Sequence, residues 1–174
     1  SENGVLFDKN QVEIIHYPAG ITNTSYCIPD SVQIIGNHAF KDCANLINIT
    51  IPNGITSIGE SAFYGCSSIK NVTIPDSMTN ISDYAFFGCV KLISITMHDR
   101  VTNIGEYAFG ECASLKNITI PDSITKIGQR AFVSCTSLTS IVIPNAVTYI
   151  GEYAFFGCTS LVTIDVNASN KNYT

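Results

Sequence analysis

The stretch Ser57–Ser77, SIGESAFYGCSSIKNVTIPDS, decides the fold because the chain repeats it. Residues 80–100 read NISDYAFFGCVKLISITMHDR, and residues 103–123 read NIGEYAFGECASLKNITIPDS. Six cysteines lie 23 residues apart, and an Ala-Phe pair begins four residues before each of them. These cysteines are Cys43, Cys66, Cys89, Cys112, Cys135 and Cys158. A period of this length, held six times, predicts a solenoid of stacked coils.

Each unit contains two kinds of apolar pattern. Residues 48–54, NITIPNG, alternate apolar and polar side chains, which predicts a strand that Pro52 ends. Residues 59–69 place apolar side chains at i, i+1, i+4 and i+7, which predicts a short helix or a 3₁₀ turn. Residues 55–59 between them are expected to form an extended arc that turns at Gly59. One such unit buries too little apolar surface to fold alone, so neighbouring coils stack with Phe over Phe in single file.

Two positions break the repeat. A glycine stands at the corner of every unit except one, where Ser82 replaces it. A proline follows every strand except one, where His98 opens the sequence MHDR and Arg100 comes two residues later. Arg100 and His98 give this loop edge a local charge identity, so they are a candidate contact site; drift in a tolerant loop is the alternative.

The repeat motif, IPxxVTxIGxxAFxxCxxLxxIxI, resembles the BspA-type leucine-rich repeat. The resemblance covers nearly all of residues 28–166, in units that start at Ile28, Ile51, Ile74, Met97, Ile120 and Ile143. It implies an α/β fold: a right-handed leucine-rich-repeat solenoid of six 23-residue repeats. A parallel sheet would form one face, and short helical or 3₁₀ turns would form the other.

The two ends of the chain depart from the repeat. Residues 1–27 resemble the family's atypical hairpin insert, with VLFD and EIIHYP as strands, and would cap the first coil. Residues 167–174 resemble the lead-in to another such insert. The chain also opens without an initiator Met, so we expect it to be a piece of a longer array.

Composition and motifs exclude several function classes. The net charge is −5 with 9 Lys and Arg residues and no basic run, which argues against nucleic acid as a partner. No apolar stretch approaches the roughly 18 residues of a membrane span. The sequence has no P-loop, GxSxG or HExxH motif, and a repeat offers the same groups at every level instead of converging different ones. We therefore expect no enzyme activity and no cofactor.

The cysteine column points inward beside Phe and Leu. Parallel Cα–Cβ vectors would keep Cβ atoms about 4.8 Å apart, beyond the ~3.8 Å that a disulfide prefers, so free buried thiols are expected. No C-x₂-C pair suggests a metal site. Cys27 differs, because it shares the outward column of Thr50. It is either an exposed thiol available for crosslinking or one that the N-terminal hairpin shields.

Two longer surfaces are candidates for binding. The first is the strand face, the outward row of the predicted sheet: Asn48, Thr50, Asn71, Thr73, Ser94, Thr96, Asn117 and Thr119. The resemblance places partners on this row, and a solvated, self-satisfied polar sheet is the alternative. The second is the aromatic ridge, which carries Tyr64, Tyr84, Phe87, Tyr107, Tyr153 and Phe156. Its aromatics suit an interface, or else pack laterally between successive turns.

The resemblance implies a non-catalytic, adhesion-type protein-binding module of a cell-surface or secreted protein. Its partner would be a host matrix protein or a cell-surface protein, and a structural spacer that binds nothing is the alternative. An uncapped C-terminal edge would also permit end-to-end self-association. Seven N-x-S/T sequons would accept glycans if the protein is eukaryotic and secreted: Asn23, Asn48, Asn71, Asn80, Asn117, Asn167 and Asn172.

Overall fold

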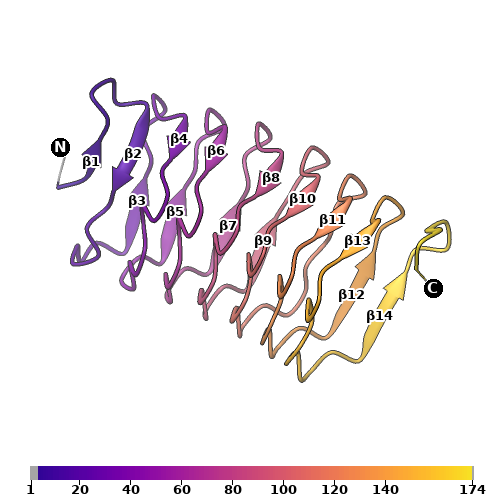
Figure 1. Ribbon diagram of the computed structural model, residues 1–174. Helices are drawn as coiled ribbons and strands as arrows, with labels where there is room; N and C mark the ends of the chain where they lie inside the picture. Colours follow the sequence, from indigo (N-terminus) through magenta and orange to yellow (C-terminus); the bar gives the residue numbers. More distant parts are fainter. Residues whose placement is uncertain (1–3, 174) are drawn as a thin grey trace.

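The coils stack side by side along one axis, with the N-terminus at one end of the stack and the C-terminus at the other (Figure 1). The computed structural model describes residues 4–173. Its strands are β1 (Leu6–Phe7), β2 (Glu13–His16), β3 (Ser25–Cys27), β4 (Ile34–Ile35), β5 (Asn48–Thr50), β6 (Ser57–Ile58), β7 (Asn71–Thr73), β8 (Asn80–Ile81), β9 (Ser94–Thr96), β10 (Asn103–Ile104), β11 (Lys126–Ile127), β12 (Ser140–Ile143), β13 (Tyr149–Ile150) and β14 (Thr163–Val166). The predicted solenoid is confirmed.

The predicted strands form the strand face in parallel pairs. β3 pairs with β5, β7 with β9 and β12 with β14, each in a register that matches residues 23 apart. Val72 and Ile95 point into the core, while the polar residues on either side of them are exposed. Residues 117–119 keep the same alternation of exposure without being paired as a strand. The parallel sheet was therefore predicted correctly, although it is interrupted.

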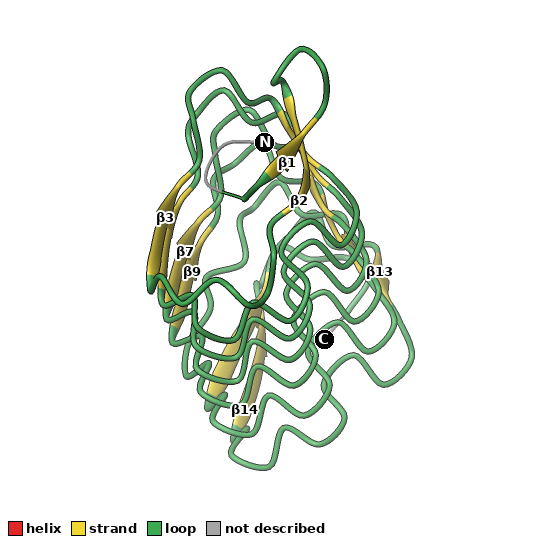
Figure 2. Ribbon diagram, turned by 90° about the vertical axis from the view of Figure 1, so that its left-hand side faces the viewer, coloured by secondary structure: helices red, strands yellow, loops and turns green. Residues whose placement is uncertain are grey.

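A second sheet occupies the segment that was expected to be only a turning arc. Each coil carries a second, two-residue strand there. Together with the hairpin strands β1 and β2, these strands pair in the orders β1-β2-β4-β6 and β8-β10-β11-β13. Figure 2 looks along the stack and shows strands on two separate sides of the coils. Ile58 and its equivalents in these strands turn into the core and are buried, except Ile150 in the last coil, which is half-buried. The spacing of apolar residues in this segment indicated burial but gave no strand signal, because two residues are too few to show alternation.

The described residues contain no helix, so the α/β class and the helical or 3₁₀ turns are wrong. Two residues of every turn adopt the left-handed conformation, which interrupts any right-handed helix. The residue before each Ala-Phe pair has φ between 51° and 59°: His38, Ser61, Tyr84, Tyr107, Arg130 and Tyr153. The residue before each column cysteine has φ between 57° and 76°: Asp42, Gly65, Gly88, Glu111, Ser134 and Gly157. Each segment is thus a chain of tight turns. Within residues 4–173 there is no helix long and apolar enough to cross a membrane.

Backbone hydrogen bonds explain why the turns replace a helix. N–H groups alternate between a carbonyl three residues back and a carbonyl of the next coil. The Phe63 N–H donates to Ala85 O at 2.8 Å, whereas the Tyr64 N–H donates to Ser61 O at 3.1 Å. An α-helix would use these donors within one segment and leave none to link coils. The turns are therefore favoured over a helix, because they leave N–H groups free to bond the next coil.

The core is a single file of aromatic rings, as predicted. Phe63 and Phe86 stack with ring centroids 5.3 Å apart, and Phe86 and Phe109 stack at 5.7 Å. The file extends through Phe132 to Phe155 at one end and through Phe40 to Tyr17 at the other. These centroid distances fall within the range of about 4.5–7 Å that aromatic pairs favour.

The six column cysteines are free and buried, as expected. Each thiol lies within hydrogen-bonding distance of a backbone carbonyl of the preceding coil, usually that of the core phenylalanine. Cys89 Sγ, for example, lies 3.3 Å from Phe63 O. The column thus supplies both small apolar volume and a weak donor between coils.

An antiparallel hairpin lies next to the first coil, and its strands fall within the VLFD and EIIHYP segments. β1 pairs with β2, and the Asp8 carboxylate accepts the N–H groups of Val12 and Glu13 at 2.7 and 2.9 Å in the connecting loop. These hydrogen bonds stabilise the carboxylate and lower the pKa of Asp8. At the other end, the Asn170 amide donates to Pro144 O at 2.7 Å, so residues up to 173 continue along the stack. Residues 1–3 and 174 of the predicted end segments lie outside the described residues.

Candidate interaction surface

The strand face brings its predicted residues together in two exposed rows. The alternation of each strand turns Ile49 and its equivalents inward and the flanking polar residues outward. All eight predicted positions are exposed: Asn48, Thr50, Asn71, Thr73, Ser94, Thr96, Asn117 and Thr119. The first member of each pair lies at the strand start and the second at the strand end. The surface is consequently polar, uncharged and several coils long.

Part of this face is satisfied by its own hydrogen bonds. The Ser94 hydroxyl donates to Asn71 Oδ1 at 2.8 Å, and the Thr139 hydroxyl lies 3.5 Å from Asn117 Oδ1. The exposed Cys27 thiol lies 3.7 Å from Thr50 Oγ1. Its exposure decides between the two sequence alternatives, because the hairpin leaves this thiol uncovered.

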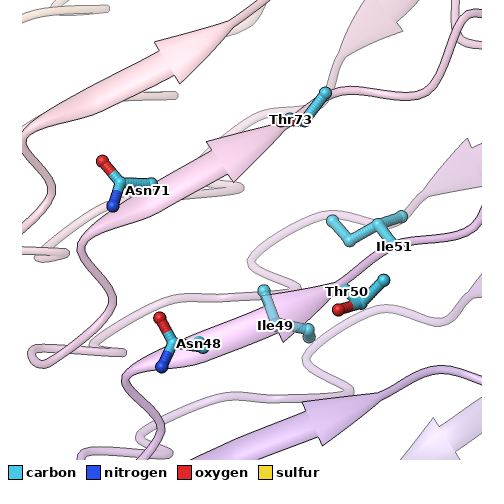
Figure 3. A pocket seen from close by; sticks show the side chains of 6 residues that line it. All are labelled: Asn48, Ile49, Thr50, Ile51, Asn71 and Thr73. Atoms are coloured by element: carbon cyan, nitrogen blue, oxygen red, sulfur yellow. The ribbon is translucent and has the colours of Figure 1, made fainter.

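A hollow of about 330 Å³ lies on the strand face between β5 and β7. Figure 3 shows Asn48 beside Asn71 at the strand starts, with Thr50 and Thr73 toward the strand ends. Ile49 and Ile51 complete the lining and are only partly buried, whereas Val72 is buried. β5 and β7 are not paired, so the hollow interrupts the sheet. A motif that treats every coil alike gave no sign of it.

The MHDR loop forms a second shallow hollow, of about 460 Å³, lined by Asp76, Ser77, His98, Asp99 and Arg100. His98 Nε2 lies 2.6 Å from Pro75 O and therefore carries the proton of the neutral ring. Its Nδ1 accepts the Arg100 N–H at 3.1 Å. The imidazole thus holds the loop in place of proline, and Arg100 remains exposed.

The aromatic ridge consists mainly of rings that pack on one another. Tyr84 stacks on Tyr107 at 4.7 Å, and Tyr64 stacks on Phe87 at 5.1 Å. Because their faces are used for stacking, these half-buried rings present mostly edges to solvent. Tyr153 and Phe156 are 55% and 65% exposed and meet edge to face. Lateral packing thus accounts for the middle of the ridge.

The described part of the chain contains no group of three His, Cys, Asp or Glu residues arranged to hold a metal ion. Two column cysteines in the middle of the stack are also poorly suited to ionise. Burial raises the pKa of Cys89 to about 12 and raises that of Cys112 as well. A thiol held neutral in this way is neither a nucleophile nor a ready metal ligand.

A protein-family model describes most of the chain. The model for the BspA type leucine rich repeat region matches residues 17–137 and 58–174, with six copies. Comparison with curated proteins gives no match.

Solved structures share the fold. A leucine-rich repeat protein from Eubacterium ventriosum is 26% identical with a TM-score of 0.75, and the match covers 94% of this chain and 50% of that one. A leucine-rich cell surface protein from Faecalibacterium prausnitzii is 32% identical with a TM-score of 0.58, over 92% of this chain and 36% of that one. The chain therefore spans half of the first relative and about a third of the second. The repeat, the stacked cores and the family match together show that the chain belongs to the BspA-type leucine-rich-repeat family.

Proposed function

We propose that this chain is a non-catalytic, adhesion-type protein-binding module of a cell-surface or secreted protein. The observation that carries the proposal is the strand face, where the same two polar positions are exposed on every coil from Asn48 to Thr119. A long row of uncharged donors and acceptors suits many modest contacts with an extended protein surface, and repetition multiplies them. The partner would be a host matrix protein or a cell-surface protein.

The comparisons support the location without naming a partner. One similar structure is titled a leucine-rich cell surface protein. Leucine-rich-repeat domains generally act as interaction scaffolds and not as enzymes, which agrees with a surface that presents the same groups on each coil.

The hollow between β5 and β7 is the proposed centre of docking. It combines the exposed amides of Asn48 and Asn71 with apolar surface from Ile49 and Ile51. A side chain of the partner can bury apolar atoms there while its polar atoms meet the amides. Arg100 would supply a charged rim one coil away, with the neutral His98 beside it.

The test is binding of the intact chain to immobilised matrix proteins by surface plasmon resonance. Replacing Asn71 and Thr73 by Arg should reduce affinity at least about tenfold, because two bulky charges would fill the hollow. The matched control, Thr125→Arg, places an exposed charge beside the second sheet and should leave affinity unchanged. Binding that survives the Asn71 and Thr73 changes would exclude the strand face.

A structural spacer is the second candidate. The hydrogen bond from Ser94 to Asn71 favours it, because a face that satisfies its own polar groups needs no partner. A spacer should bind no matrix or cell-surface protein at micromolar concentration. Its length should still increase in proportion to the number of coils.

Two modifications would modulate the proposed surface. Asn48, Asn71 and Asn117 are exposed at equivalent strand starts, so glycans there, in a eukaryotic secreted protein, would cover the strand face. The other sequon residues are exposed or half-buried: Asn23, Asn80, Asn167 and Asn172. Cys27 lies beside the same face, so oxidative crosslinking through its thiol would join two chains there. End-to-end association through the C-terminal edge stays a prediction as well.

A further inference from the structure

Among the described coils, one junction is unpaired in both sheets, whereas the junctions on either side of residues 117–119 are unpaired on the strand face alone. The junction unpaired in both sheets lies between residues 48–58 on one coil and residues 71–81 on the next, and we call it the seam. β5 is not paired with β7 on the strand face, and β6 is not paired with β8 in the second sheet. The junctions on both sides of the seam are paired in both sheets, through β3-β5 and β4-β6 before it and β7-β9 and β8-β10 after it.

The same interruption appears between the sheets. Thr56 and Thr102 each donate their N–H to the preceding coil at 2.8 Å, but Thr79 makes no such bond to Thr56. On the strand face, the Ile28 and Ile74 N–H groups donate to the next coil at 3.1 and 2.9 Å, and that of Ile51 does not. The Met97 and Ile120 N–H groups lack this bond too, so the interruption that is particular to the seam is the one at Thr79. The seam therefore runs without interruption along this stretch of the coil.

Ser82 supplies the physical cause in the second sheet. The other corner residues are glycines, and their N–H groups donate to the preceding coil, as Gly105 does to Ile81 O at 2.9 Å. A Cβ at Gly105 would lie 2.7 Å from Asp83 N, and one at Gly128 would lie 2.5 Å from Gly105 C, which are distances that no packed carbon tolerates. The Cβ of Ser82 therefore holds its coil away from the preceding one. Its hydroxyl donates to Ile58 O at 2.6 Å in place of the missing N–H bond.

The turn side of the same junction remains closed. Ser61, Phe63 and Gly65 donate their N–H groups to the next coil at 3.0, 2.8 and 2.8 Å. Phe63 stacks on Phe86 in the core, and Tyr64 stacks on Phe87 outside it. Hollows lie at the seam on both sheets, one of about 330 Å³ between β5 and β7 and one of about 380 Å³ around Gly59 and Ser82. The two coils are thus hydrogen-bonded along the turns and unpaired in both sheets. A junction that is held on one side only can act as a hinge.

We propose that the seam is a hinge, with its axis along the turns at residues 61–65 and 84–88, about which the coils before it bend relative to the coils after it. This inference does not depend on the proposed function. Ser82 fixes the position of the hinge, and the Ser77 and Ser82 hydroxyls, which bond to carbonyls across the seam, are the contacts that bending breaks.

Hydrogen exchange of the intact chain by NMR tests the open junction. The Thr79 amide should exchange at least about tenfold faster than the equivalent Thr102 amide, because only the latter is bonded to a neighbouring coil. Ser82→Gly should slow Thr79 to the rate of Thr102, whereas Ser82→Ala, which keeps the Cβ, should leave it fast. Gly105→Ser should create a second open junction and accelerate Thr102.

Equal rates for Thr79 and Thr102 in the unmodified chain would overturn the proposal, as would a Thr79 rate that Ser82→Gly leaves unchanged. Bending is measured as the distribution of distances between two spin labels on opposite sides of the seam. The labels are attached at Gln33→Cys and Tyr149→Cys, in a chain that also carries Cys27→Ala so that the exposed thiol is not labelled. Ser82→Gly should narrow their distance distribution and leave that of a control pair, Arg100→Cys and Tyr149→Cys, as it was. An unchanged width for the first pair would show a rigid junction.

Discussion

At the residue scale, the cysteines divide into one that solvent reaches and six that it does not. Cys27 is exposed, and the column cysteines are buried beside the stacked phenylalanines. We expect a thiol reagent at pH 8 to modify one cysteine in the native chain and seven after unfolding in urea. Fast modification of a second native thiol would contradict the close packing of the column.

The buried thiols should also make stability fall at alkaline pH. Burial raises the pKa of Cys89 to about 12, and hydrogen bonding to the Cys43 thiol, together with burial, raises that of Cys66. The unfolded chain releases these protons near the ordinary thiol value of 9.0, while the folded chain retains them. Stability is therefore complete below pH 9 and decreases above it, by about 1.4 kcal/mol per pH unit for each retained proton.

Urea unfolding between pH 8 and pH 11 measures this slope. Cys89→Ala removes one retained proton and should lower the slope by about 1.4 kcal/mol per pH unit, whereas Cys27→Ala should not alter it. A Cys89→Ala slope equal to that of the unmodified chain would show that the thiols do not cause the effect.

At the scale of elements, the turns are where sequence reasoning failed. Apolar spacing at i, i+4 and i+7 suits a helix, and the same spacing serves a chain of turns that buries Ala62, Phe63 and Cys66. The residue before each column cysteine has a left-handed conformation, which glycine favours, but only three of the six coils carry glycine there. The glycines are Gly65, Gly88 and Gly157, and the other three residues are Asp42, Glu111 and Ser134. The left-handed position was therefore not recognisable from the repeat. The strands of the strand face were predictable because β-branched residues alternate in them and Pro follows most of them. The second sheet was not predictable within the repeats, because each strand there is two residues long.

The left-handed position offers a stabilising substitution. Glu111 has φ of 59°, which costs a residue with a Cβ roughly 1–2 kcal/mol, and its column carries glycine in three other coils. Glu111→Gly should raise the free energy of unfolding by about 1 kcal/mol after the entropic cost of glycine is subtracted. Chemical denaturation measures the change. The reverse substitution, Gly88→Ala, should destabilise by a similar amount, and stabilisation by it would contradict the assignment.

At the scale of the whole molecule, the candidate site was partly predictable. The repeat alone identified the exposed rows of the strand face, since alternation fixes which residues point outward. It did not identify the hollow beside Asn71, which lies where β5 and β7 are unpaired. A periodic sequence therefore predicts the features that all coils share, such as the exposed rows. Features of a single junction, such as the hollow, have to be read from the structure.

Stacking in one dimension makes the length of the chain adjustable in whole coils. Deleting residues 97–119 removes one period and joins Thr96 to Ile120, so every column of the core stays aligned across the new junction. The shortened chain should fold with the same circular dichroism spectrum and a lower free energy of unfolding, because one set of coil contacts is lost. Deleting residues 97–107 removes less than half a period, which would place Phe109 and Cys112 out of line with the columns of the preceding coils, so that chain should lose its cooperative transition. If both deletions unfolded alike, the coils would not be interchangeable units, and contacts between distant coils would have to stabilise the fold.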